Sequence, residues 1–334
     1  MAIVANTATT YTGATIREDL SDVIYNIAPM DTPFLSGCSK GKAEATLFEW
    51  QIDTIVAGSA NRQLEGDDSP APRDTSSEQP TKLTNYTQIS RAVNMTSGTD
   101  EVVNYAGRGK AQAYMLAKAG KRMKRDMEFM LTNNIVKAAG STSGARATAG
   151  LPSWLNTGWV NGGSGGSPAA GSLGTTAMVL AGANVAASEA NIKAVIKACF
   201  DAGGQPDMIL VPSAVKQTIS GLASVGSGTT SLGVPPRHNV GNGPATAVAA
   251  VDVYVSDFGT FKIVPDRNLA TDGVGSVAAN AFFLDMDFWA INWLRPWHTE
   301  TMAKTGDSIK QMLIAEYGLV SRNEKSSGLL ANVK

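Results

Sequence analysis

Residues 100–134 read DEVVNYAGRGKAQAYMLAKAGKRMKRDMEFMLTNN and hold the most regular pattern in the chain. Small and apolar residues recur here at steps of four and three, as on one face of an α-helix. A hydroxyl cap at Ser97 or Thr99, with Asp100 and Glu101 in the first turn, predicts the start of this helix. A helix that runs to Asn134 would be about 50 Å long, so it should lie along a surface, with its small residues against a sheet or the N-terminal arm. The stripe comprises Val102, Ala106, Gly109, Ala113, Leu116, Gly120, Met123, Met127 and Met130.

Ahead of this helix, two β-prone runs flank a long polar loop. Phe48–Asp53 alternates apolar and polar residues, and Leu83–Met95 is rich in Thr, Tyr, Ile and Val, so the two runs should pair as a hairpin. The loop between them, Ala57–Pro80, exceeds the roughly 12 to 15 residues that a structureless loop reaches inside a compact domain. A hairpin that projects from the body and becomes ordered on a neighbouring molecule would account for this length.

The N-terminal segment combines an arm without periodicity and a short amphipathic helix. Within Ile16–Ile27, one helical face carries Leu20, Val23, Ile24 and Ile27. Pro29 and Pro33 then end the helix and favour an extended segment.

Helices and strands alternate in the second half of the chain. Gly140–Leu173 is rich in Gly, Ser, Ala and Thr and is expected to be a flexible surface connection between two subdomains. The predicted fold class is α+β, with a C-terminal third that is mainly β. The expected elements are helix Glu189–Asp201, strand Met208–Val211, helix Ala214–Ser220, and strands Ala249–Val255, Thr260–Val264, Ala281–Leu294 and Gln311–Val320.

The composition favours an assembling protein. Only 17% of the 334 residues are charged, against about 25% in an ordinary soluble protein, which suits a surface largely buried against other subunits. A net charge of −1 argues against a protein whose main task is to grip nucleic acid. Two cysteines, Cys38 and Cys199, are expected to be small buried residues in a reducing compartment. We expect neither a secretory signal nor a membrane span.

The usual catalytic motifs fail on inspection. The only histidines are His238, expected to be exposed in a loop, and His298, expected to have a structural role in an aromatic stretch. Gly162–Gly166 matches the Gly-x-Ser-x-Gly elbow of hydrolases but lies in a low-complexity stretch, and Gly41-Lys42 lacks the Ser or Thr of a phosphate loop. We therefore predict no catalytic, cofactor-binding or metal-binding residue, and no enzyme.

Four segments resemble one family. Ile16–Phe34, which reads IREDLSDVIYNIAPMDTPF, resembles the N-terminal signature of a group of major capsid proteins from tailed bacteriophages. Leu294-Arg295-Pro296 with Ala303–Ser308, and Glu316–Leu319, resemble the closing segment of that group. The likeness follows the order of the elements over nearly the whole chain.

The resemblance implies the Hong Kong 97-type capsid fold. Its parts would be an N-terminal arm and short helix over 1–44, an extended hairpin loop over 45–96, and a spine helix with the first part of a peripheral β-rich domain over 97–172. An axial domain would cover 173–248, and the returning peripheral strands 249–334. The implied function is self-assembly into hexamers and pentamers that close an icosahedral shell around double-stranded DNA.

The same resemblance implies partners and contacts. Expected partners are further copies of the chain, a separate scaffolding protein (since no long helical leader precedes the arm), a portal, decoration proteins in some shells, and DNA held without sequence preference. Shells are expected to be non-covalent, and to assemble in the bacterial cytoplasm.

Two sets of residues are candidates for contacts with these partners. A basic cluster, either a solvated helix face or a surface toward the genome, comprises Lys118, Lys121, Arg122, Lys124 and Arg125; loop contacts to a neighbour would use Arg62, Leu64, Glu65, Asp67, Asp68 and Arg73.

Two alternatives stay open at this point. An encapsulin-like nanocompartment would share the fold and enclose cargo enzymes instead of a genome. A hydrolase with a Gly-rich lid is disfavoured by the missing catalytic constellation.

Overall fold

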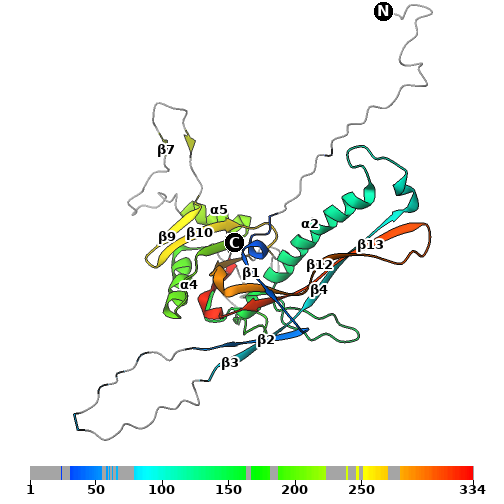
Figure 1. The fold of residues 1–334 in the computed structure, drawn as a ribbon. Helices are drawn as coiled ribbons and strands as arrows, with labels where there is room; N and C mark the ends of the chain where they lie inside the picture. Colours follow the sequence, from blue (N-terminus) through cyan, green and yellow to red (C-terminus); the bar gives the residue numbers. More distant parts are fainter. Residues whose placement is uncertain are drawn as a thin grey trace, which may run out of the picture.

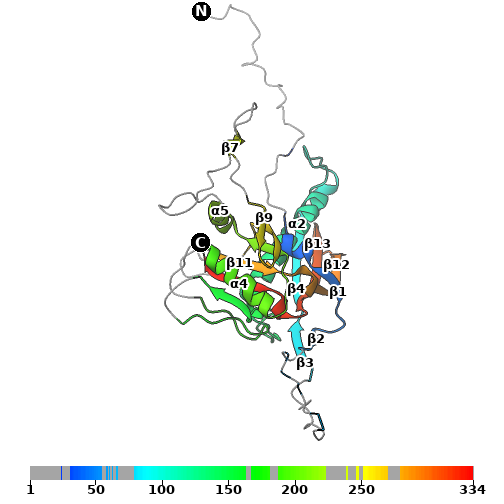
Figure 2. The same cartoon turned by 90° about the vertical axis from the view of Figure 1, so that its left-hand side faces the viewer.

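The computed structural model describes residues 24, 31–54, 58, 60, 62, 65–66, 79–162, 167–180, 187–222, 238–239, 246–247, 251–269 and 279–333. Two sheets and one long helix form its body (Figures 1 and 2). The described residues place helices and strands in one chain, which confirms the α+β class.

The first sheet has the order β1-β12-β13-β4. The strands β12 (Trp289–Thr301), β13 (Ser308–Ser321) and β4 (Gln88–Ser97) are antiparallel, and the short β1 (Ser39–Lys42) lies parallel to β12. The long helix α2 (Ala111–Thr132) runs along one face of this sheet (Figure 1). A Cβ on Gly120 would be 3.8 Å from the Leu313 side chain, which is an ordinary van der Waals distance, so the sheet packs on the small-residue stripe through a side chain and not through the close backbone approach that was expected.

The second sheet has the order β5-β14-β11-β6-β10-β9. Its core joins α4 to the sheet through Ile192, Val195, Phe261, Phe283 and Leu330, all buried. The elements are β5 (Gly158–Asn161), β14 (Gly328–Val333), β11 (Ala279–Leu284), β6 (Met208–Val211), β10 (Gly259–Pro265) and β9 (Val253–Ser256), with the helices α4 (Glu189–Asp201) and α5 (Ser213–Leu222).

The hairpin forms outside both sheets. Strands β2 (Leu47–Ile52) and β3 (Thr81–Tyr86) pair antiparallel and extend away from the body (Figure 1). The smaller elements are α1 (Pro33–Gly37), α3 (Leu151–Trp154), β7 (His238–Asn239) paired with β8 (Thr246–Ala247), and the 3-10 turns η2 (Gly98–Glu101), η3 (Met286–Phe288) and η4 (Glu324–Ser326).

The predicted start of the long helix is wrong. Ser97 caps the 3-10 turn η2, and the chain then turns through Gly107 and Gly109, whose φ angles of 72° and 61° are outside the helical region. The helix itself begins at Ala111, so it is about 33 Å long rather than 50 Å. Asp100 does serve a helix N-terminus, because its carboxylate accepts from the backbone N–H of Ala111 (3.1 Å) and Gln112 (3.0 Å).

The Gly/Ser-rich stretch 140–173 is also not simply a flexible surface connection. Leu151 and Trp154 are fully buried in the main core, and β5 joins the second sheet. Gly150 within the stretch and Gly174 directly after it serve close packing: a Cβ on Gly150 would be 1.9 Å from the carbonyl oxygen of Asn133, and a Cβ on Gly174 would be 3.1 Å from the Trp154 ring. At these two positions the glycine therefore permits a tight contact.

The remaining predicted boundaries of helices and strands either agree with the structure or differ from it. The predictions of Glu189–Asp201 and Met208–Val211 are confirmed. The run Leu83–Met95 divides at Thr87 into β3 and β4, and Ala281–Leu294 divides around η3 into β11 and β12. Strand β14 was not predicted, since its sequence GLLANV shows no alternation and all six residues are buried.

Candidate assembly surfaces

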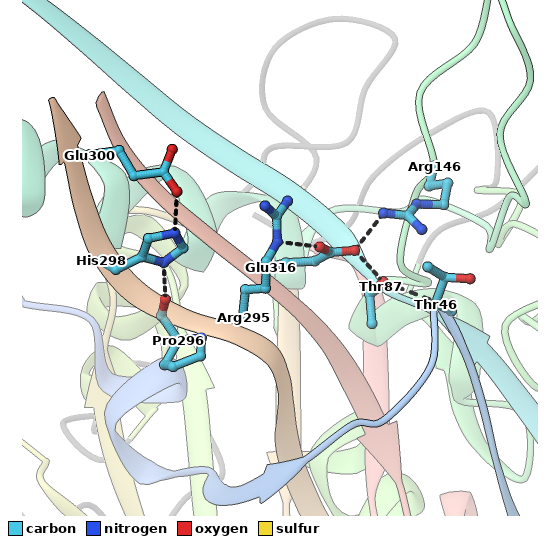
Figure 3. A network of polar contacts seen from close by, with 8 residues as sticks. All are labelled: Thr46, Thr87, Arg146, Arg295, Pro296, His298, Glu300 and Glu316. Carbon is cyan, nitrogen blue, oxygen red and sulfur yellow. Dashed lines mark hydrogen bonds and ion pairs between the residues drawn. The ribbon is translucent and has the colours of Figure 1, made fainter. Parts of the chain in front are cut away.

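Thr87 joins the hairpin to the first sheet. Its backbone N–H donates to the carbonyl of Thr46 (2.8 Å), across the two ends of the hairpin. Its side-chain hydroxyl donates to Oε1 of Glu316 on β13 (2.8 Å; Figure 3). One fully buried residue therefore ties both strands of the hairpin to a strand of the body.

Glu316 is the centre of this network. It is 3% exposed, and such a buried carboxylate requires charged or hydrogen-bonding partners. Arg295 Nε on β12 donates to Oε2 (2.9 Å), and Arg146 forms an ion pair with Oε1 from the loop before α3 (Figure 3). Four separate segments thus meet at one carboxylate at the root of the hairpin.

Aromatic and amide side chains reinforce the root. Trp50 on β2 donates its indole N–H to the carbonyl of Ser321 (2.8 Å) and lies 5.5 Å from the Trp154 ring, between centroids. Phe48 covers Gly318 so closely that a Cβ there would be 2.4 Å from its ring. The buried Asn85 donates to the carbonyl of Leu319 (2.7 Å). The base of the hairpin is therefore fixed to the body at several points.

Lys137 makes a further polar contact to the hairpin. Its Nζ donates to both oxygens of Thr84 at 2.9 Å, and burial lowers the pKa of this amine. Thr84 lies on β3, three residues before Thr87.

Glu316 does have a signal in the sequence. Met312–Val320 is otherwise an apolar run, and a lone carboxylate in a buried strand demands a partner. The partners themselves, Arg146 and Arg295, are 170 and 21 positions away, so only the fold identifies them.

His298 lies at the exposed edge of the same sheet. Its ring nitrogens contact the Pro296 carbonyl (2.8 Å) and the Glu300 carboxylate (3.2 Å; Figure 3). These contacts orient the ring, in keeping with a structural role. His238 lies in β7, and its side-chain environment is outside the described residues.

A second polar site anchors the segment before β1. Glu128 on α2 is fully buried, and its two oxygens accept from the backbone N–H groups of Phe34 (2.8 Å) and Leu35 (2.7 Å), so it caps the N-terminus of α1. Asn268 donates to the carbonyl of Asp31 (2.7 Å). Burial, followed by the nearby charge of Asp266, raises the pKa of Glu128 to about 8, and burial also raises the pKa of Asp266.

The five basic residues of α2 are brought onto one helix but do not act alike. Lys118, Lys121 and Lys124 are exposed. Arg122 lies 3.8 Å from Asp126, one turn on, and Arg125 Nε donates to Oδ1 of Asn268 (3.3 Å). The cluster is therefore a largely solvated surface. Its one partly buried member, Arg125, contacts Asn268, which also binds the carbonyl of Asp31.

Of the predicted loop contacts, the structure places two. Arg62 and Glu65 are exposed, and Leu64, Asp67, Asp68 and Arg73 lie outside the described residues.

The described residues contain no cluster of three or more His, Cys, Asp or Glu that could hold a metal ion. In the same part of the chain, no helix is both long enough and apolar enough to cross a membrane. Cys38 and Cys199 are free and buried, as expected, and burial raises the pKa of both thiols.

Comparison with known proteins decides the family. The family model of the SU10 major capsid protein matches residues 3–334. This chain belongs to that family. It is therefore a structural subunit of a phage capsid shell, a component of the virion that assembles from many copies.

Individual relatives agree. The major capsid protein of Escherichia phage Phieco32 is 27% identical over 91% of this chain and 90% of its own length. The capsid protein of cyanophage A-1(L) superposes with a TM-score of 0.62 at 13% identity, over 98% of this chain and 99% of its own. The SrpI encapsulin of Synechococcus elongatus gives a TM-score of 0.55 at 10% identity, over 93% of each chain. The Hong Kong 97-type fold is thus confirmed, and the family match favours a phage capsid over a nanocompartment.

Proposed function

We propose that this capsid subunit forms hexamers and pentamers that close an icosahedral shell around double-stranded DNA, and that it performs no catalysis. The observation that supports this most directly is the root of the hairpin. Thr87, Glu316 and Trp50 hold its base firmly to the body, while β2 and β3 extend beyond it. A rigidly rooted projection is suited to holding a neighbour in a defined direction while the bodies tilt.

The parts of the chain would then divide as the family resemblance suggests. We propose an arm over 1–44, the extended loop over 45–96, a spine and first peripheral part over 97–172, an axial domain over 173–248 and returning peripheral strands over 249–334. A scaffolding protein, a portal and decoration proteins are the proposed partners, with assembly in the bacterial cytoplasm and without covalent cross-links.

The loop residues and the basic cluster have proposed roles in this scheme. Arg62, Glu65 and the other four loop residues would contact a neighbouring subunit. The exposed lysines of α2 would contact packaged DNA without sequence preference, because uncompensated cations bind phosphates in that way. Neutralising all five basic residues should reduce retention of a full genome in assembled particles, and normal retention would refute this role.

Deleting Ser59–Gln79 tests the hairpin. We expect a folded subunit that forms no stable shells, because the fixed base of the hairpin lies outside the deletion. Circular dichroism would report folding, and negative-stain electron microscopy would report assembly, alone and with the neighbouring genes coexpressed. Normal shells from the deleted chain would contradict the proposal.

The contents of the shell test the alternative. Nuclease-protected DNA of uniform length inside purified shells would support a genome container. Shells that instead retain a cargo enzyme and no DNA would favour a nanocompartment, whose fold this chain shares.

A further inference from the structure

An apolar groove runs beside α2 on the face next to the first sheet. Its volume is about 520 Å³, and it is open to solvent. Small side chains of α2 and the side chains of Trp297 and Leu313 form its floor, and two lysines stand at its rim. The lining residues are Ala113, Leu116, Ala117, Gly120, Lys121, Lys124, Trp297 and Leu313.

The groove continues the face of α2 on which the arm already rests. Glu128, Lys124, Lys121, Ala117 and Ala113 follow one another at steps of four and three, so they share one side of the helix. At the Glu128 end this side receives α1 through the two backbone hydrogen bonds described above. Met127 and Leu131 pack with Phe34 in the same core. The chain that precedes α1 therefore enters at one end of this groove.

We propose that the amphipathic segment Ile16–Ile27 of the same chain docks in this groove as a helix. Three residues, Ala28–Met30, separate Ile27 from Asp31, which is held by Asn268, and the four Cα–Cα steps of this link span at most about 14 Å. A helix of this segment would be about 18 Å long, and the stretch of α2 from Glu128 back to Ala113 is about 22 Å. The link and the helical segment together are therefore long enough to cover the groove.

The chemistry of the segment matches that of the groove. Leu20, Val23, Ile24 and Ile27 form an apolar face for the apolar floor, and Ile24 is 44% exposed in the structure. On a helix with 100° per residue, Asp19 lies at the edge of that face, whereas Glu18 and Asp22 lie on the opposite side. The ion pairs found among the described residues do not include Lys121 or Lys124, so either amine is available to Asp19.

This docking goes beyond the proposed function and does not depend on what the shell encloses. Before assembly it assigns Lys121 and Lys124 to the arm of their own subunit, and release of the arm would leave them free for the DNA contact proposed above. Lys118 and Arg122, farther around the helix, are not part of the groove. An arm held in this way would be withheld from neighbouring subunits until it is released.

Disulfide trapping in the full-length chain tests the docking. The pair Ile24→Cys with Ala117→Cys places one thiol on the segment and one in the groove; Leu20→Cys with Ala113→Cys covers the next register. The control pair Ile24→Cys with Arg122→Cys uses the opposite side of the same helix. The native Cys38 and Cys199 are buried and stay in place. We expect a disulfide within one chain for the groove pairs and loss of that product for the control pair.

Charge reversal provides a second, independent test. Lys121→Glu with Lys124→Glu should abolish the trapped product, and adding Asp19→Lys should restore part of it, whereas adding Asp22→Lys, on the opposite side of the segment, should not. Mixing isotope-labelled and unlabelled chains before oxidation distinguishes products within a chain from products between chains. Equal trapping at positions 117 and 122 would overturn the proposal, as would groove disulfides that form only between chains, because the occupant would then be a second copy.

Discussion

Removing both arginines from around Glu316 should cost more stability than the two single losses added together. Arg146→Ala leaves the carboxylate with Arg295 and Thr87; because the Arg146 side chain is only 23% exposed, we expect a loss of about 2 kcal/mol. Arg295 is 43% exposed and its contact is better screened, so Arg295→Ala should cost about 1 kcal/mol.

The double variant leaves a carboxylate that is 4% exposed with one neutral donor, the Thr87 hydroxyl. A buried charge without a cation costs about 3–5 kcal/mol, so the double variant should exceed the sum of the single losses by about 1 kcal/mol. Adding Glu316→Gln to the double variant should recover part of the loss, since the amide carries no charge.

Chemical denaturation of the unassembled subunit gives these free energies, with the midpoint and slope fitted together. Shell yield by sedimentation then reports whether the hairpin root is displaced. Strictly additive losses, or a triple variant no more stable than the double one, would refute the view that Glu316 is a buried charge dependent on the two arginines.

Three further results are expected. The pKa of Glu128 is raised to about 8, so the stability it contributes is present below its ordinary value near 4.5 and is lost as the pH rises toward 8; Glu128→Gln should flatten denaturation midpoints measured between those values. Gly318→Ala should cost about 1–3 kcal/mol in thermal unfolding, because the Cβ would meet Phe48, and Phe48→Leu should relieve it; Gly306→Ala, which meets no neighbour within 4 Å, is the matched control. Cys38 and Cys199 should react with a thiol reagent only after unfolding, and rapid labelling of the native chain would contradict their burial.

Local pattern predicted the elements that local forces determine. The helical spacing of apolar residues in Glu189–Asp201 and the continuous apolar run Met208–Val211 are sufficient on their own to predict a helix and a strand, and the boundaries of both are confirmed. The predicted start of α2 was wrong because Asp100 caps the helix from a distance: its carboxylate accepts from the backbone N–H of Ala111, eleven positions along the chain. From the sequence alone, a capping residue is expected to lie directly before the helix that it caps. Strand β14 was missed because a strand buried on both faces shows no alternation.

The assembly surfaces were predictable only in part. The long polar loop indicated a projecting hairpin, because its length has no place inside a compact domain. What holds the hairpin at its base was not predictable, since Thr87, Arg146, Arg295 and Glu316 meet only when four separate segments have folded. The groove beside α2 likewise depends on the sheet that supplies Trp297 and Leu313.

Strand β14 sits between β5 and β11, although it follows both of them in the chain. While a ribosome is still adding these residues, β5 has no partner in the second sheet, and the core that joins α4 to Leu330 is incomplete. A chain that stops before these residues therefore lacks a complete second sheet, and we expect such truncated subunits to be excluded from shells.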